Sequence, residues 1–181
     1  MQPAGRGSGP RQHMSIVTDR RAWLLFALTA LGLEATALWF QYAMGLDPCV
    51  KCVYERVAVL GLVTAGVLGA LYPRAFLLRI AAYLLWLISA AWGLRLALQH
   101  VGIQDDPSTA FSCSFAAEFP TWAKLDEWLP AVFLPTGYCD DIQWQWLSLT
   151  MAQWMVVVFA LYLISLAVVL VIDWRRDRSR R

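Results

Sequence analysis

The chain contains 181 residues, of which 59% are hydrophobic and only 15% are charged. Soluble domains are nearer about 45–50% apolar and about 25% charged, so this composition excludes a disordered chain and argues against an ordinary soluble domain. The net charge of +2 is too small to indicate a nucleic-acid partner. These numbers favour a single small membrane domain without a separate soluble module.

Four apolar blocks follow one another along the chain, and each approaches the roughly 20 residues that a helix needs to cross a bilayer. We therefore predict an all-α membrane protein, a bundle of four transmembrane helices. The helices are expected at residues 22–43, 53–72, 75–98 and 152–172. Between and beyond them lie two loops, residues 44–52 and 99–151, and two polar tails, residues 1–21 and 173–181. In the second helix a stripe of small residues, Gly61, Ala65 and Gly69, favours close helix packing.

Positive charge gathers on one side of this predicted bundle. Arginines occupy both tails and the turn between the second and third helices: Arg6, Arg11, Arg20, Arg21, Arg74, Arg79, Arg175, Arg176, Arg178, Arg180 and Arg181. The long loop is acidic instead. Because cytoplasmic flanks collect Lys and Arg, we expect both termini in the cytoplasm and both loops on the opposite face. The first block exceeds the about 7–15 apolar residues of a cleaved signal peptide, which favours a membrane helix.

A short helix is expected inside the long loop. Apolar residues recur there at helical spacing, opposite Lys124, Asp126 and Glu127. The stripe consists of Phe119, Trp122, Leu125, Trp128, Leu129 and Val132. Such a pattern indicates a helix lying flat on the membrane surface. A packed lid over the helix ends is the alternative.

Four cysteines fall outside the cytoplasm in this topology, where disulfides persist. Cys49 and Cys52 stand at the entrance to the second helix, with Asp47 as a possible N-cap and Pro48 at the first helical position. The free N–H groups of a first helical turn favour a thiolate. Helical spacing places Arg56 on the same face as both sulfurs, and an arginine entering lipid indicates a functional role, with snorkelling to phosphate as the alternative.

The spacing of the cysteines narrows their chemistry without settling it. A Cys-x-x-Cys pair can be redox-active, zinc-binding or structural, but zinc sites usually add a second close pair or nearby histidines. A disulfide between Cys49 and Cys52 closes so short a loop that it adds little stability, which favours exchange. Cys113 and Cys139 lie far apart, and a bond that only staples the long loop is equally compatible with their positions.

Several motifs in fixed order resemble the bacterial disulfide bond formation protein B (DsbB) family. They are Ala37–Tyr42 (ALWFQY), Pro48–Arg56 (PCVKCVYER), Phe111–Cys113 (FSC), and Trp128–Pro130 (WLP) followed by Gly137–Cys139 (GYC). The resemblance spans residues 23–171. It implies an inner-membrane thiol oxidase that reoxidises a periplasmic DsbA-type dithiol protein and passes the electrons to a membrane quinone, either ubiquinone or menaquinone.

The resemblance also implies roles for individual residues. The reduced partner attacks a Cys113–Cys139 disulfide and forms a mixed disulfide at Cys113. The released Cys139 then exchanges with Cys49, which frees Cys52 against the quinone. Family members place the quinone near residues that match Arg56 and His100, with Gln104 a further candidate. Without the resemblance, His100 reads as an ordinary polar residue at a helix end.

The energetics of this implied relay require a strong final oxidant. A DsbA-type dithiol has a potential near about −120 mV, so glutathione near about −200 mV cannot oxidise it, whereas a lipid-borne quinone supplies the driving force. Lys51 departs from the apolar residue expected between the first two cysteines, and its charge is expected to favour thiolate there.

Two other functions fit parts of the pattern. One is a non-catalytic membrane adaptor braced by two structural disulfides, and the other is a metal-handling membrane protein with four thiolate ligands. We expect no metal. Glu34, in the middle of the first helix, is either a proton-carrying group near the quinone or a neutral acid hydrogen-bonded between helices.

Overall fold

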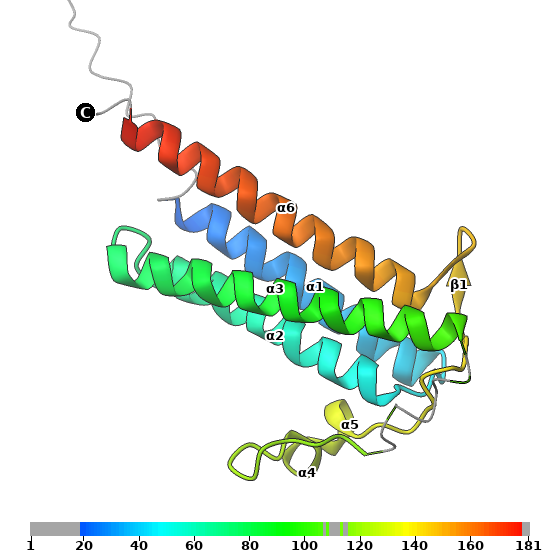
Figure 1. Ribbon diagram of the computed structural model, residues 1–181. Coiled ribbons are helices and arrows are strands. Elements are labelled where there is room, and N and C mark those ends of the chain that lie inside the picture. The colour runs from blue at the N-terminus through cyan, green and yellow to red at the C-terminus, as the bar shows by residue number, and fades with distance from the viewer. Residues whose placement is uncertain (1–18, 107, 109–112, 114–115, 179–181) are drawn as a thin grey trace, which may run out of the picture.

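A computed structural model describes residues 19–106, 108, 113 and 116–178 and shows a bundle of long helices (Figure 1). The long helices are α1 (Arg20–Ala43), α2 (Val50–Leu71), α3 (Phe76–Asp105) and α6 (Met151–Arg178). Each is long and apolar enough to cross a membrane. The predicted all-α, four-helix membrane architecture is thereby confirmed. Most of the N-terminal tail and the last three residues of the C-terminal tail lie outside the described ranges.

Two helix boundaries differ from the prediction in ways that matter for the site. The second helix begins at Val50 rather than at residue 53, and α3 continues to Asp105 rather than ending at residue 98. Polar side chains end an apolar block but do not interrupt the backbone hydrogen bonds of a helix. His100 and Gln104 therefore project from a rigid helix and not from the loop.

The cap of α2 also differs from the prediction. Its N-cap is Cys49, whose sulfur accepts a hydrogen bond from the backbone N–H of Cys52, and Pro48 precedes the helix. The predicted cap, Asp47, does not cap the helix; its carboxylate instead accepts a hydrogen bond from the Thr136 hydroxyl at 2.9 Å. A sulfur, rather than a carboxylate, thus occupies the electropositive start of α2.

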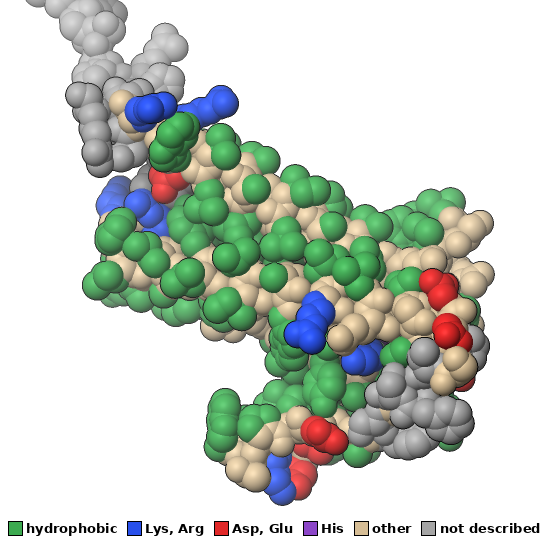
Figure 2. Space-filling view, in the orientation of Figure 1, with side chains coloured by type: hydrophobic (Ala, Val, Ile, Leu, Met, Phe, Trp, Pro, Cys, Tyr) green, Lys and Arg blue, Asp and Glu red, His purple; other side chains and the backbone are tan. Residues whose placement is uncertain are grey.

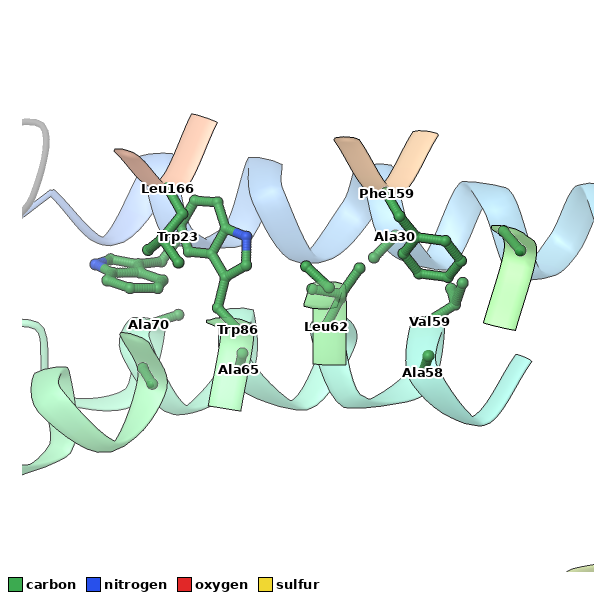
Figure 3. Packing of buried hydrophobic residues seen from close by; sticks show 13 residues of the cluster. Trp23, Ala30, Ala58, Val59, Leu62, Ala65, Ala70, Trp86, Phe159 and Leu166 are labelled. Atoms are coloured by element: carbon green, nitrogen blue, oxygen red, sulfur yellow. The ribbon is translucent and has the colours of Figure 1, made fainter. Parts of the chain in front are cut away.

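The core lies where α2 packs between α1 and α3, with α6 closing the bundle against α3 (Figure 3). Trp23 of α1 and Trp86 of α3 meet edge to face with ring centroids 6.2 Å apart. Small residues allow α2 to lie close to both α1 and α3. An added Cβ at Gly69 would overlap the Trp23 ring of α1, and one at Gly61 would overlap the Ser89 side chain of α3. The small-residue stripe of α2 therefore packs against two neighbouring helices, as its spacing predicted.

The long loop is built from short elements. The expected single surface helix is instead two one-turn helices, α4 (Leu125–Trp128) and α5 (Pro130–Phe133). Pro130 lacks an N–H and disfavours helical geometry at the preceding Leu129, so the helix breaks there. This part of the loop folds back beside the bundle (Figure 1) and exposes Trp122 and Trp128.

A small hairpin that the sequence did not predict precedes α6. Strands β1 (Gln145–Trp146) and β2 (Leu149–Thr150) pair antiparallel. Leu147 and Ser148 make the turn with positive φ angles of 52° and 63°. The turn lacks the Asn-Gly or Gly-x signal from which such hairpins are usually recognised.

Charge is distributed unevenly along the bundle axis (Figure 2). Basic side chains gather at the end where α6 finishes, and acidic ones gather around the loop end. Arg79 of α3 also pairs with Asp173 of α6 at 3.9 Å, at the basic end. The protein is thus a multi-pass membrane protein whose two ends differ in charge.

Candidate functional site

A cavity of about 280 Å³ opens at the loop end of the bundle. Its walls come from α1, the start of α2, the end of α3, the start of α6 and the segment that precedes β1. Apolar side chains dominate the wall, among them Leu33, Phe40, Val59, Met155 and Val158. Pockets of this kind, apolar with a few placed polar groups, bind small hydrophobic molecules.

The two nearby cysteines line this cavity as a close pair. Their sulfurs lie 3.0 Å apart, and the backbone N–H of Cys52 points at the sulfur of Cys49 at 3.3 Å. The hydrogen bond from the Cys52 side chain lowers the pKa of the Cys49 thiol, against the opposing effect of burial. The backbone N–H of Lys51 also lowers this pKa, whereas its ammonium group bonds to Gln99 at 3.0 Å. Lys51 therefore acts on Cys49 through its backbone.

His100 of α3 completes a polar chain next to the cysteine pair. Its Nε2 lies 3.6 Å from the sulfur of Cys49, and its Nδ1 lies 3.4 Å from a carboxylate oxygen of Glu55. Glu55 and His100 are both buried. A carboxylate on one ring nitrogen fixes the orientation of an imidazole and increases its basicity at the other nitrogen. The arrangement can therefore accept a proton from the Cys49 thiol.

Arg56 is buried at the cavity wall and holds three elements together. One guanidinium nitrogen donates to the side chain of Gln41 at 2.7 Å and to the backbone carbonyl of Val132 at 2.6 Å. The other donates to the carbonyl of Ala37 at 3.4 Å. The planar guanidinium suits several acceptors at once. Arg56 thus places a fixed positive charge beside the cavity and fastens α5 to α1 and α2.

The loop is fastened a second time directly before Cys49. The backbone N–H groups of Thr136 and Gly137 donate to the carbonyl of Pro48 at 2.9 and 3.1 Å. Gly137 is required here, because a Cβ would overlap the carbonyl of Asp47. Gln143 closes the same region by bonding to the backbone of Asp47.

The distant cysteines form a disulfide, Cys113–Cys139, with Cα atoms 6.6 Å apart. Cys113, Cys139 and Cys49 belong to one small buried cluster with Val50 and Ile103, against which Cys52 also packs. The fold therefore gathers all four cysteines at the loop end of the bundle, although Cys113 and Cys139 follow Cys52 only after α3 and much of the loop.

Comparison with known proteins accounts for this combination of cavity and cysteines. The sequence model of the family described as Disulfide bond formation protein DsbB matches residues 19–169. The chain belongs to the DsbB family. Disulfide bond formation protein B of Shewanella loihica is 57% identical over 153 residues, which cover 84% of the chain and 90% of that relative. The proteins of the same name from Shewanella amazonensis and Psychromonas ingrahamii are 51% and 52% identical over 152 and 148 residues, covering 84% and 82% of the chain and 90% and 80% of the relatives.

Membership of the DsbB family confirms the resemblance and identifies a disulfide-generating membrane oxidoreductase. Five of the residues that the sequence singled out line the cavity: Cys49, Cys52, Arg56, His100 and Gln104. The other two, Cys113 and Cys139, lie in the buried cluster that contains Cys49. Gln104 is also bound to the Thr150 hydroxyl at 2.8 Å, which ties the end of α3 to the start of α6.

Sequence reasoning missed two residues that bond to side chains of the DsbB site. Glu55 carried a signal, since it stands three residues after Cys52 on the same helical face, but only the fold shows that it faces His100. Gln41 belonged to a family motif without an assigned role and proves to bind Arg56. The four-thiolate metal site considered above does not form among the described residues, because Cys113 and Cys139 are bonded to each other.

Proposed function

We propose that this DsbB-family protein is an inner-membrane thiol oxidase that reoxidises a periplasmic DsbA-type dithiol protein and reduces a membrane quinone. One observation carries the proposal: the Cys49–Cys52 pair lines an apolar cavity on one side and shares a buried cluster with the Cys113–Cys139 disulfide on the other. A soluble partner and a lipid-borne acceptor can thereby exchange electrons through four adjacent sulfurs.

The partner side of the reaction is a series of thiol–disulfide exchanges. A thiolate of the reduced partner attacks Cys113, and the bond to Cys139 breaks. The Cys139 thiolate attacks Cys49 of the oxidised Cys49–Cys52 pair, so Cys52 leaves as a thiolate. The partner's second thiolate then displaces Cys113. The Cys113 thiolate attacks Cys139, the bond between Cys139 and Cys49 breaks, and Cys49 leaves as a thiolate. The oxidised partner departs, and two electrons remain on Cys49 and Cys52.

The acceptor side fits a quinone, ubiquinone or menaquinone. The cavity wall is mostly apolar, and Arg56 and His100 are among its few polar side chains, which could bond to the ring oxygens of a quinone. A bound quinone supplies an acceptor for two electrons and two protons while the Cys49–Cys52 disulfide re-forms. His100, held by Glu55, takes the proton of the Cys49 thiol, and Arg56 provides positive charge on the cavity wall.

The charge distribution supports the orientation that this relay needs. The basic end of the bundle, with Arg74 in the turn between α2 and α3, suits the cytoplasmic face, and the acidic loop end suits the periplasm. We therefore place both termini in the cytoplasm, and all four cysteines on the oxidising side of the inner membrane.

Reconstitution tests the proposed function. The purified protein is mixed with a short-chain ubiquinone and a reduced DsbA-type protein, and quinone absorbance is followed. The wild-type protein should consume quinone and the Cys52→Ser variant should not, because only Cys52 is freed toward the cavity. A wild-type protein that consumes none would support the non-catalytic adaptor instead.

Trapping tests the order of the exchanges. In the Cys139→Ala variant Cys113 is a free thiol, so the trap starts from the oxidised partner. The Cys113 thiolate attacks the partner's disulfide, that S–S bond breaks, and a covalent complex through Cys113 should accumulate because Cys139 is not there to displace the partner. The matched Cys113→Ala variant should trap nothing in this way. A partner captured at Cys49 or Cys52 in the Cys139→Ala protein would contradict the proposed order.

A further inference from the structure

Glu34 is a buried acid close enough to Arg56 to interact with its charge, but it makes no hydrogen bond within the described part of the chain. It lies in the middle of α1 with 6% of its surface exposed, and neither carboxyl oxygen has a hydrogen-bond partner among the described residues. An acidic side chain at the depth of a membrane helix is costly, and a buried polar group without a hydrogen bond adds to that cost. The fold therefore retains a group that weakens it, which is typical of functional positions.

Glu34 lies on the wall of the cavity that holds the cysteine pair. It occupies the same face of α1 as Ala37 and Gln41, three and seven residues further on, and both of these accept hydrogen bonds from Arg56. Glu34 is thus one helical turn deeper in the membrane than the contacts of Arg56. The cavity runs from the sulfurs at the loop end to a carboxyl group farther inside the bundle.

Three other polar side chains of the cavity wall already make hydrogen bonds. Arg56 binds Gln41 and two carbonyls, His100 binds Glu55, and Gln104 binds Thr150. Glu34 alone among these polar groups has both of its polar atoms unused. In its neutral form such a carboxyl group carries one O–H that can be donated.

We propose that Glu34 donates this O–H to the carbonyl oxygen of the bound quinone that lies away from Cys52, and that the same proton passes to that oxygen when the ring is reduced. The proposal rests on the function proposed above. The Cys49–Cys52 dithiol gives up two electrons and two protons as its two S–H bonds break and one S–S bond forms. The quinone gains the two electrons and two protons; one proton comes from Glu34, which then regains one of those released by the dithiol.

The neutral acid can be replaced in two informative ways. Glu34→Gln keeps a hydrogen-bond donor but has no proton to transfer, whereas Glu34→Leu has neither. We expect Glu34→Leu to bind a short-chain ubiquinone at least about tenfold more weakly, the equivalent of one lost hydrogen bond. Glu34→Gln should bind within about threefold of the wild type, yet reduce quinone in a single turnover about 100-fold more slowly, the usual effect of losing a general acid.

Thermal unfolding separates this role from a structural one. Without quinone, Glu34→Leu should unfold at the same temperature as the wild type or higher, because it removes an unpaired buried polar group. Thr29→Val serves as the control, since Thr29 is on the same helix, bonds to Tyr162 and does not line the cavity. It should leave quinone affinity unchanged.

Infrared difference spectra give a readout that does not depend on turnover. Addition of quinone to the resting protein should shift the carbonyl stretch of one protonated carboxylic acid, and this signal should be absent in Glu34→Gln. Unchanged affinity and unchanged single-turnover rate in Glu34→Leu would overturn the role of Glu34 while leaving the oxidase intact. Failure of the wild-type protein to bind quinone would instead overturn both this role and the proposed function.

Discussion

Cys49 shows how single hydrogen bonds set the chemistry of the site. As the N-cap of α2 it accepts the backbone N–H of Cys52, and the Cys52 side chain lowers the pKa of its thiol. At a pH below the ordinary thiol value a lower pKa means a larger thiolate fraction, so reduced Cys49 should be alkylated faster than an unperturbed thiol. Cys52→Ala should raise this pKa and slow alkylation at that pH.

Mass spectrometry of the alkylated protein over a pH series checks this prediction, with Cys113 and Cys139 replaced by serine so that only the first pair reacts. Cys52→Ser is the matched control, because its hydroxyl still donates to the Cys49 sulfur. Alkylation of Cys49 that follows the same pH curve in the Ser and Ala variants would show that the side-chain hydrogen bond is unimportant.

Arg56 should be needed for the shape of the loop as well as for charge. Arg56→Lys keeps the charge, but a single ammonium group cannot serve Gln41, Val132 and Ala37 together. Because buried hydrogen bonds to charged groups contribute about 1.5–3 kcal/mol, we expect a loss of stability in that range. The region around Val132 should also become more sensitive to proteolysis.

Arg79→Lys is the control for the Arg56→Lys substitution. Arg79 makes a partly exposed ion pair with Asp173 at 3.9 Å, and such pairs contribute only about 0–1 kcal/mol. Denaturant unfolding in detergent and limited proteolysis compare the two variants. Equal effects of the two lysine substitutions would contradict the role given to the Arg56 guanidinium.

At the scale of elements, the close contact between α3 and α6 requires a glycine at position 93. A Cβ at Gly93 would overlap the ring of Phe159, which is fully buried. Gly93→Ala should therefore destabilise the bundle by about 1–3 kcal/mol through overpacking. Gly102→Ala, on the same helix with open space around it, should stabilise by up to about 1 kcal/mol through helix propensity. Unfolding midpoints that move in the same direction for both variants would contradict this packing.

The elements also show what the sequence could and could not reveal. Apolar length was sufficient to find α1, α2, α3 and α6, because the bilayer imposes that length. Apolar length failed at the end of α3, where residues 99–105 include several polar side chains but remain helical. In the long loop, the helical spacing of the apolar residues predicted one surface helix. The structure has two, because Pro130 interrupts the helix.

At the scale of the whole molecule, the limit of sequence reasoning is separation along the chain. Cys49, Cys52 and Arg56 were found together because helical spacing relates them. The contact of Glu55 with His100 joins residues 45 apart, and that of Arg56 with Val132 joins residues 76 apart. No local pattern encodes such contacts. The family resemblance supplied His100, whereas the role of the Val132 carbonyl emerged only from the fold.

The orientation of the whole molecule in the membrane can be tested by labelling introduced cysteines. If the basic end faces the cytoplasm, a cysteine at the loop end is open to reagents outside the cell membrane and one in the α2–α3 turn is not. Trp122 and Tyr72 are suitable positions, with 79% and 67% of their surfaces exposed. In a protein whose four native cysteines are replaced by serine, Trp122→Cys should react with a membrane-impermeant maleimide in intact spheroplasts. Tyr72→Cys should react only after permeabilisation. The reverse pattern would place the cysteine relay on the reducing side of the membrane, where its disulfides could not persist.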